Sequence, residues 1–374
     1  MSILKKQRSR KSFDEKLDIK SPNTKLQYKK AIANFEKFCS EKYKNNSVED
    51  IINELKIASK KDQDVVFDVL QDWINWNSKR LSPAVVRTWF SCFRGYLHYC
   101  GVKLHPQDVK ENLDFPQRIE EELHPLSEGE IRKILSVANH QKKALYLAQL
   151  SSGMRLGELM RIRKKDLILS QKRIVVKIPA TFTKKNRART TFFSREAQKA
   201  ILPYLKRLGD DDLIFYHKSS ADRAVNTEEH TLIRYCEKVG LDQRYPSSSR
   251  HKITSHSFRA YFITKISRHD ENFAKKLAGQ KGYLLQYDRM TEEEKLEKYL
   301  EFEPALLVFD ESKKNAELEK LKKENKEPTQ NRQLIDDLQT QLVQLQFELK
   351  AVRTSVQAKY DDELQQRKEK FGID

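Results

Sequence analysis

Residues 152–159 read Ser-Gly-Met-Arg-Leu-Gly-Glu-Leu, and the interpretation of the whole chain depends on this stretch. Arg155 and Glu158 stand at positions i and i+3, a spacing that places both side chains on one face of a helix. The usual explanation of such a pair is a surface ion pair, which contributes about 0–1 kcal/mol. The stretch becomes informative only together with residues farther along the chain.

A second pair with the same spacing lies downstream, where residues 256–259 read His-Ser-Phe-Arg. A helix presents His256 and Arg259 side by side, and two such donors can bind the oxygens of one phosphate. A single His-x-x-Arg motif is common and by itself predicts little. A group of tyrosines lies downstream of this pair, at Tyr283, Tyr287 and Tyr299.

The composition indicates a large, basic, globular protein. A length of 374 residues corresponds to two or three domains. With 38% hydrophobic and 34% charged residues, the chain is neither a membrane protein nor wholly disordered. The 72 Lys and Arg residues exceed the 54 Asp and Glu residues and give a formal charge of +18, which favours nucleic acid as a partner.

Cysteine spacing and hydropathy exclude several other classes. The four cysteines lie far apart, without the close spacing of a zinc site or of a disulfide framework. We therefore expect no metal and no cofactor. The sequence has no run of 18 apolar residues, and its N-terminus lacks the apolar stretch of a secretory signal. These features predict a cytoplasmic protein without a membrane partner.

The N-terminal part of the chain predicts an arm followed by a helical domain. Residues 1–20 are polar and basic and predict a flexible arm. Residues 21–105 predict an all-helical domain, since apolar side chains recur there at helical spacing. One helix is predicted to begin at Ser82 and Pro83 and to end at Gly101. Its apolar stripe consists of Val86, Trp89, Phe90, Phe93, Tyr96, Leu97 and Cys100.

A proline-containing linker over 106–119 is expected to separate this domain from a second one over 120–310. Ser127 and Glu130 have the spacing of a helix capping box. Two short runs of β-branched and aromatic residues, 172–180 and 187–193, predict antiparallel strands joined by a basic turn. The second domain is therefore predicted to be helical with one small sheet.

Residues 311–374 form a charged tail of a different character. The tail contains 13 basic and 13 acidic residues, so the whole charge of +18 belongs to residues 1–310. Residues 334–357 predict a coiled coil, because apolar residues alternate there in steps of three and four. The alternative is a single amphipathic helix that packs on its own domain. The apolar positions are Ile335, Leu338, Leu342, Leu345, Leu349, Val352 and Val356.

Read in order, the charged and hydroxylic residues form a recognisable set. The sequence resembles the tyrosine recombinase (lambda-integrase) family, in particular its archaeal-type members. The resemblance covers about residues 20–305 and includes HPLSEGEIRKIL at 124–135, which is similar to the start of that family's catalytic domain. The residues that carry it are Arg155, Lys184, His256, Arg259 and Tyr287.

The resemblance implies a fold and an assembly. The expected fold is mainly α with a small antiparallel β-sheet, in the two-domain architecture of the family, followed by the C-terminal coiled-coil helix. The two domains are expected to clamp double-stranded DNA, and the protein to act as a homo-oligomer, a tetramer on two paired sites. The heptad pattern of the tail adds the expectation of a coiled-coil partner. The family implies a prokaryotic, nucleoid-associated protein in the cytoplasm.

The resemblance also implies roles for residues before position 200. Arg155 matches the first catalytic arginine, and Glu158 matches the acidic residue that supports it. Lys184 matches the lysine of the β-hairpin, which acts as general acid toward the leaving 5′ oxygen. Lys185 is the near alternative to Lys184.

Further roles follow for the second half of the set. His256 is expected to assist proton transfer, and Arg259 to bind the scissile phosphate. Transfer of a DNA phosphodiester to a hydroxyl requires a nucleophile, cations around the phosphate and an acid for the leaving oxygen. Arginine and lysine supply the positive charge in such a site, in agreement with the expected absence of a metal.

One position departs from the family pattern, and the nucleophile is not unique. The family has a Leu-Gly-His segment where this chain has Gln280 after Leu-Ala-Gly, and an amide can donate a hydrogen bond but cannot exchange a proton. Either Gln280 substitutes with a loss of rate, or the activity is impaired. Tyr287 occupies the position of the nucleophile, before an Arg-x-Thr-Glu run. Tyr299 is the alternative nucleophile, and Tyr283 lies too close to Gln280.

The expected function is site-specific DNA recombination, in integration, excision or resolution, through a 3′-phosphotyrosyl intermediate. One alternative is a catalytically impaired, recombinase-derived accessory protein that binds DNA. Another is strand passage like that of a type IB topoisomerase. A coiled-coil architectural protein explains the tail and the charge but leaves the ordered residue set unexplained.

Overall fold

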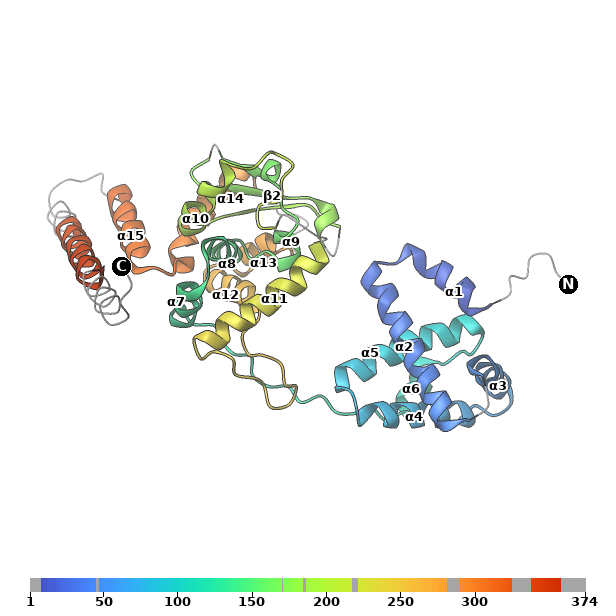
Figure 1. Cartoon of the computed structure of the whole chain (residues 1–374). Helices are drawn as coiled ribbons and strands as arrows, with labels where there is room; N and C mark the ends of the chain where they lie inside the picture. Colours follow the sequence, from blue (N-terminus) through green and yellow to red (C-terminus); the bar gives the residue numbers. More distant parts are fainter. Residues whose placement is uncertain are drawn as a thin grey trace, which may run out of the picture. The chain divides into compact units, whose positions relative to one another are not determined.

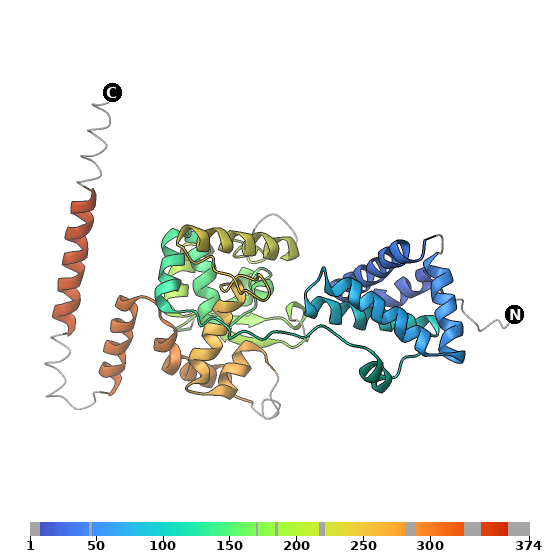
Figure 2. The same cartoon turned by 90° about the horizontal axis from the view of Figure 1, so that it is seen from below.

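The computed structural model describes residues 8–44, 47–169, 171–183, 186–216, 221–280, 289–324 and 338–357. The chain divides into two compact units, Met1–Glu122 and Leu123–Asp374. Figures 1 and 2 show the helices of the first unit, and the helices and small sheet of the second. No helix in the described ranges is both long and apolar enough to cross a lipid bilayer.

The first unit is built from helices around an aromatic core. Phe35 stacks on Phe93 with ring centroids 4.0 Å apart, and Trp73 packs edge-on against Phe35 at 5.6 Å. The predicted all-helical structure of this region is confirmed. The helices are α1 (Arg10–Lys16), α2 (Pro22–Lys42), α3 (Val48–Lys61), α4 (Asp64–Ser78), α5 (Pro83–Cys100) and α6 (Pro106–Asn112), with the 3-10 turn η1 (Leu17–Ile19) after α1.

The structure differs from the prediction of a flexible arm over residues 1–20. Residues 1–7 lie outside the described residues, but α1 and η1 follow them and pack into the core of the first unit. Ser9 caps α1, and Phe13 and Leu17 are buried, with Phe13 4.9 Å from the ring of Tyr96. The sequence signal for this helix is only the one apolar pair at i and i+4, and the basic residues around that pair favoured the prediction of a flexible arm.

The expected linker over 106–119 is also partly wrong. Pro106 begins α6, where proline is compatible with a helix because the N–H groups of the first turn have no intrahelical acceptor. Val109 and Leu113 are buried in the core of the first unit. Phe115 packs against Phe90 at 4.9 Å, so the first unit extends beyond α6.

The second unit contains a three-stranded antiparallel sheet in the order β1-β2-β3. β2 (Val175–Ile178) pairs with β3 (Arg189–Phe192), which confirms the two predicted strands. β1 (Leu167–Ile168) pairs with β2 and was not predicted, since two residues carry no periodic signal. In register, Ile178 faces Arg189, so the β2–β3 connection leaves the sheet beside Arg189.

The helices of the second unit surround α8. This helix is buried along most of its length, and its Tyr146 stacks on Phe258 of α12 at 5.2 Å. The capping box of Ser127 and Glu130 begins α7 as predicted. The helices are α7 (Glu128–Val137), α8 (His140–Ser152), α9 (Leu156–Leu159), α10 (Arg195–Leu205), α11 (Ala221–Lys238), α12 (Ser255–Ser267), α13 (Glu271–Ala278), α14 (Glu292–Phe302) and α15 (Asp310–Glu324), with 3-10 turns η2 (Lys164–Asp166), η3 (Ala180–Phe182) and η5 (Glu303–Leu306).

The predicted coiled-coil segment is helical in the part that the structure describes, residues 338–357. Ile335, the first residue of the predicted apolar series, lies outside the described residues. Leu345, Leu349, Val352 and Val356 of the same series are exposed.

Gly153 ends α8 and allows a prediction about stability. Its φ of 62° is left-handed, and a Cβ atom there would lie 2.3 Å from Cδ1 of the buried Phe262. We expect Gly153→Ala to lower the free energy of unfolding by about 2–4 kcal/mol, through backbone strain and overpacking. The control Gly129→Ala, in a helix with no atom within 4 Å of the added methyl, should be neutral or stabilising. Urea titration measures both, and equal effects would contradict this account.

Candidate active site

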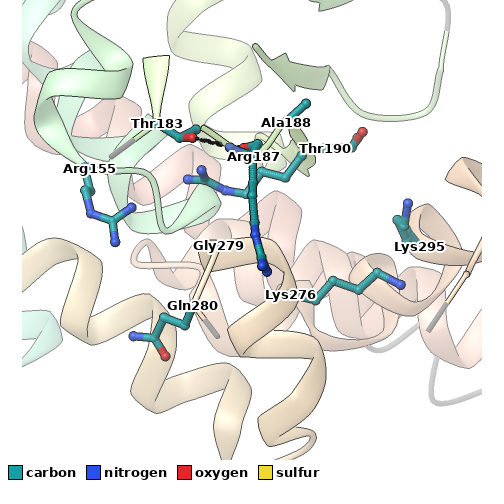
Figure 3. Close-up of a pocket in the computed structure, with 10 residues that line it drawn as sticks. Arg155, Thr183, Arg187, Ala188, Thr190, Lys276, Gly279, Gln280 and Lys295 are labelled. Carbon is teal, nitrogen blue, oxygen red and sulfur yellow. Dashed lines mark hydrogen bonds between the residues drawn. The ribbon is translucent and has the colours of Figure 1, made fainter. Parts of the chain in front are cut away.

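A pocket of about 220 Å³ lies in the second unit beside the β2–β3 connection. Figure 3 shows the side chains that line it. Of the described residues around this pocket, five are cationic and none is acidic, so it is suited to an anion. The cationic residues are Arg155, Arg187, Arg189, Lys276 and Lys295. Within the described ranges, no cluster of His, Cys, Asp and Glu side chains is arranged to hold a metal ion.

Glu158 is the buried carboxylate that fixes two of these arginines. Its side chain is 2% exposed and accepts two bonds from Arg189, with Nη1 at 3.1 Å from Oε1 and Nη2 at 2.6 Å from Oε2. Arg155 Nη1 lies 3.0 Å from Oε1. Burial alone would raise the pKa of Glu158, but hydrogen bonds and charge from Arg189 and Arg155 lower it. Glu158 is therefore ionised at neutral pH.

Arg155 is placed by the end of one helix and the start of the next. Gly153 ends α8, and Arg155 is the N-cap of α9, where its backbone N–H donates to Glu158 Oε2 at 2.8 Å. The predicted i, i+3 pair is present, but as a cap rather than within a helix. The Arg155 side chain remains 36% exposed and so can reach a ligand in the pocket.

Arg259 on α12 is 1% exposed and joins two helix ends. It donates from Nη1 to the carbonyl of Gly153 and from Nη2 to that of Ala278 at 2.7 Å. Carbonyls at helix C-termini carry partial negative charge, which suits a guanidinium. Burial and then the charge of Arg155 lower the pKa of Arg259 to about 10, so it remains protonated at neutral pH.

His256 lies in the first turn of α12, three residues before Arg259. Its pKa is lowered, first because the surrounding protein partly desolvates the ring and then because Arg259 and Arg155 oppose a further positive charge. The imidazole is therefore neutral near pH 7 and can accept a proton. The predicted neighbours are both on this helix, but Arg259 is buried whereas His256 is exposed.

Gln280 reaches the pocket because α13 ends immediately before it. Gly279 adopts a φ of 67°, and the backbone N–H of Gln280 donates to the carbonyl of Lys275 at 2.9 Å. A Cβ atom on Gly279 would lie 2.9 Å from Nη1 of Arg189, so this helix end is in close contact with the arginine. The structure thus brings Gln280 to the same pocket as Arg155.

Two predicted site residues lie outside the described residues. Lys184 and its alternative Lys185 fall between Thr183 and Asn186, and Tyr287 and Tyr283 fall between Gln280 and Arg289. Thr183 lines the pocket, and its hydroxyl accepts from the N–H of Arg187 at 2.9 Å. Thr183 and Arg187, which lie on either side of the predicted lysine in the sequence, therefore both line the pocket.

Tyr299, the alternative nucleophile, is a core residue in this structure. Its side chain on α14 is fully buried, and its hydroxyl donates to the carbonyl of Ser151 at 2.8 Å. Burial raises the pKa of this phenol well above its ordinary value. A nucleophilic role would require Tyr299 to leave the core.

Sequence analysis assigned no role to several residues of the pocket. Arg189 lies in the predicted strand run 187–193 and was given no role there, although it makes the bidentate contact with Glu158 and donates from Nε to the carbonyl of Leu277 at 2.8 Å. A charged residue within a predicted strand is the sequence feature that could have indicated a role for Arg189. Lys276 and Lys295 lie on the helices α13 and α14, where exposed lysines are ordinary.

Comparisons with known proteins bear on the family and the fold of this chain. The model of the phage integrase family matches residues 125–279. Among solved structures, a lambda integrase (75–356) dimer bound to a COC′ core site has a TM-score of 0.50 at 15% identity, over 75% of this chain and 97% of that chain. The XerH site-specific recombinase bound to difH substrate has a TM-score of 0.50 at 16% identity, over 77% and 82%. No curated protein sequence matches the chain.

The comparisons support the phage integrase family over part of the chain and do not support its archaeal-type subgroup. XerA recombinase, at 18% identity over 78% of this chain and 97% of that chain, has a TM-score of only 0.35. The likeness to lambda integrase and XerH shows a shared, mainly helical fold. The family match spans Arg155, Arg189 and Arg259 together with the carboxylate between the first two. The segment 125–279 therefore matches the phage integrase family, and the chain shares a mainly helical fold with lambda integrase and XerH.

Proposed function

We propose that this protein is a site-specific DNA recombinase that cleaves and rejoins DNA through a 3′-phosphotyrosyl intermediate. The observation that carries the proposal is the pairing of Arg155 and Arg189 with the buried carboxylate of Glu158, with the charge of Arg259 nearby, beside a pocket lined by cations. Three guanidinium groups against one carboxylate leave an excess of positive charge. A phosphodiester is the anion that DNA offers to such a site.

In the proposed reaction, Tyr287 attacks the scissile phosphorus. Its phenol loses a proton, for which neutral His256 is an acceptor, and a new bond joins the tyrosine oxygen to the 3′ phosphate. The 5′ oxygen leaves and takes a proton from Lys184. The free 5′-hydroxyl of a partner strand then attacks the phosphotyrosine and releases the enzyme. One phosphoester bond replaces another at each step, so no external energy source is required.

The arginines act by stabilising the charge that develops on the phosphate. Arg259 is oriented by its carbonyl acceptors on Gly153 and Ala278, and Arg155 is oriented by Glu158. Donors fixed in advance need not reorganise during the reaction, which makes them effective in catalysis. Gln280 is proposed to donate a neutral hydrogen bond to a phosphate oxygen.

Double-stranded DNA is the proposed partner, in a tetramer on two paired sites. Residues 1–310 carry the whole formal charge of +18 and attract the DNA backbone without regard to sequence. The affinity should fall with salt, with a logarithmic slope of about −0.9 for each phosphate neutralised. The charge-neutral tail is proposed to contact protein through its coiled-coil helix. A prokaryotic, nucleoid-associated location is part of the same proposal.

A covalent-capture assay tests the proposal against its two alternatives. The chain is incubated with short random-sequence duplexes, from which the segment beyond a cleavage point can dissociate. Protein-linked DNA is recovered under denaturing conditions and sequenced. We expect the protein-linked DNA to be enriched in one sequence. We also expect a released strand with a free 5′-hydroxyl, which a polynucleotide kinase can label.

Other outcomes of this assay would contradict the proposal. Adducts without sequence enrichment would indicate a topoisomerase-like activity. Sequence-specific binding without any adduct would indicate an accessory protein. Gln280→His is included as a variant, because histidine can exchange a proton where glutamine cannot. An adduct formed by Gln280→His and not by the natural chain would identify Gln280 as the cause of impaired activity.

A further inference from the structure

The helix over residues 338–357 exposes an apolar stripe to solvent. Leu345, Leu349, Val352 and Val356 are 43%, 56%, 59% and 60% exposed. Exposed apolar residues that occur singly are ordinary, but a continuous stripe along a helix marks an interaction surface. The question is which partner this surface fits.

The spacing of the stripe is that of a coiled coil. From Leu338 to Val356 the apolar positions alternate in steps of three and four, as a and d positions of successive heptads do. The a positions are Leu342, Leu349 and Val356, and the d positions are Leu338, Leu345 and Val352. An amphipathic helix that packs on a globular domain usually has a broader stripe with a period of 3.6 residues.

The charges beside the stripe identify the partner and its direction. Glu348 occupies a g position and Arg353 the following e position. In a parallel, in-register pair of identical helices, Glu348 of one chain meets Arg353 of the other, twice by symmetry. In an antiparallel pair that still packs the a and d residues of the two helices together, Glu348 of one chain faces Glu348 of the other. The helix is therefore complementary to itself when parallel and repulsive when antiparallel.

We propose that helix 338–357 pairs, parallel and in register, with the same helix of a second copy of this chain. The tail is suited to self-association, because its 13 basic and 13 acidic residues cancel. This inference goes beyond recombination and rests on the proposed function only for the DNA that brings two chains together. A coiled coil of about three heptads is weak by itself, but two chains held on one DNA have an effective concentration on the order of millimolar.

The opposite face of the helix supplies a matched control. Phe347 is 75% exposed and Val343 is 66% exposed, and both lie outside the a and d positions. In a parallel pair, residues at a d position approach within disulfide distance, whereas residues at an f position such as Phe347 point away from the partner.

Disulfide trapping in the full chain tests this inference. We expect Leu345→Cys to form a covalent dimer on oxidation, at least ten-fold faster than Phe347→Cys and than the natural chain with its four cysteines. Both substitutions replace exposed side chains, so neither should disturb the folded units. Equal rates for the two variants would overturn the proposal. A mixture of Leu345→Cys and Leu349→Cys that forms the disulfide faster than Leu345→Cys alone would also overturn it, because that result would indicate antiparallel pairing.

Charge reversal provides an independent test by sedimentation equilibrium. Glu348→Arg and Arg353→Glu should each weaken dimerisation by about five-fold, since each places like charges together twice. The double variant should restore the natural affinity, because the pair is then reversed and not lost. A double variant that dimerises as weakly as either single one would contradict the proposed register.

Discussion

Tyr287→Phe is expected to abolish the covalent protein–DNA adduct, with a rate loss on the order of 10⁴-fold or more. The substitution removes only the nucleophilic oxygen and keeps the ring, so DNA binding should be unchanged. Covalent capture on the enriched duplex measures the adduct, and a gel-shift titration measures binding.

Tyr299→Phe is the matched control for this experiment. It removes the hydroxyl that donates to the carbonyl of Ser151, so a loss of about 1 kcal/mol in the free energy of unfolding is expected. Adduct formation should persist. If instead Tyr287→Phe forms the adduct and Tyr299→Phe does not, the nucleophile has been assigned to the wrong tyrosine.

Arg155→Ala is expected to slow adduct formation by about 10²- to 10³-fold, the usual effect of removing one preorganised charge. The free energy of unfolding should change little, because Glu158 keeps its bidentate contact with Arg189 and is not left unpaired. Single-turnover rates at saturating protein concentration separate this effect from weaker binding.

Two further variants show whether the effect belongs to the pocket. Arg207→Ala removes the same charge from an exposed residue that does not line the pocket, and should leave the rate within about two-fold. Arg259→Ala should lower both the rate and the stability, because the carbonyls of Gly153 and Ala278 lose their donors. If Arg207→Ala lost as much rate as Arg155→Ala, the charge of Arg155 would affect the rate only by attracting DNA to the protein.

The elements that could be predicted from the sequence are those with local signals. Ser127 and Glu130 form their capping box within one helical turn, and β2 and β3 are separated by a short connection. Helix α1 was missed because Phe13 and Leu17 find their apolar partners on other helices of the first unit. Likewise, α6 was mistaken for linker because proline at a helix start resembles proline in a loop.

Within the candidate site, the local contact could be predicted from the sequence and the long-range contacts could not. Arg155 and Glu158 are three residues apart, and the structure confirms that they pair. Arg189 meets Glu158 across 31 positions, and Arg259 meets Gly153 across 106 positions, so no local pattern indicates either contact. These long-range contacts explain how one carboxylate and two helix ends orient the arginines.

Peptide mapping of the captured adduct tests the central claim most directly. The protein-linked DNA is digested with nuclease and protease, and mass spectrometry identifies the peptide that carries the remaining nucleotide. The proposed mechanism predicts a phosphodiester link between a 3′ phosphate and the phenol of Tyr287. A nucleotide on Tyr299, on another residue, or attached through a 5′ phosphate would contradict it.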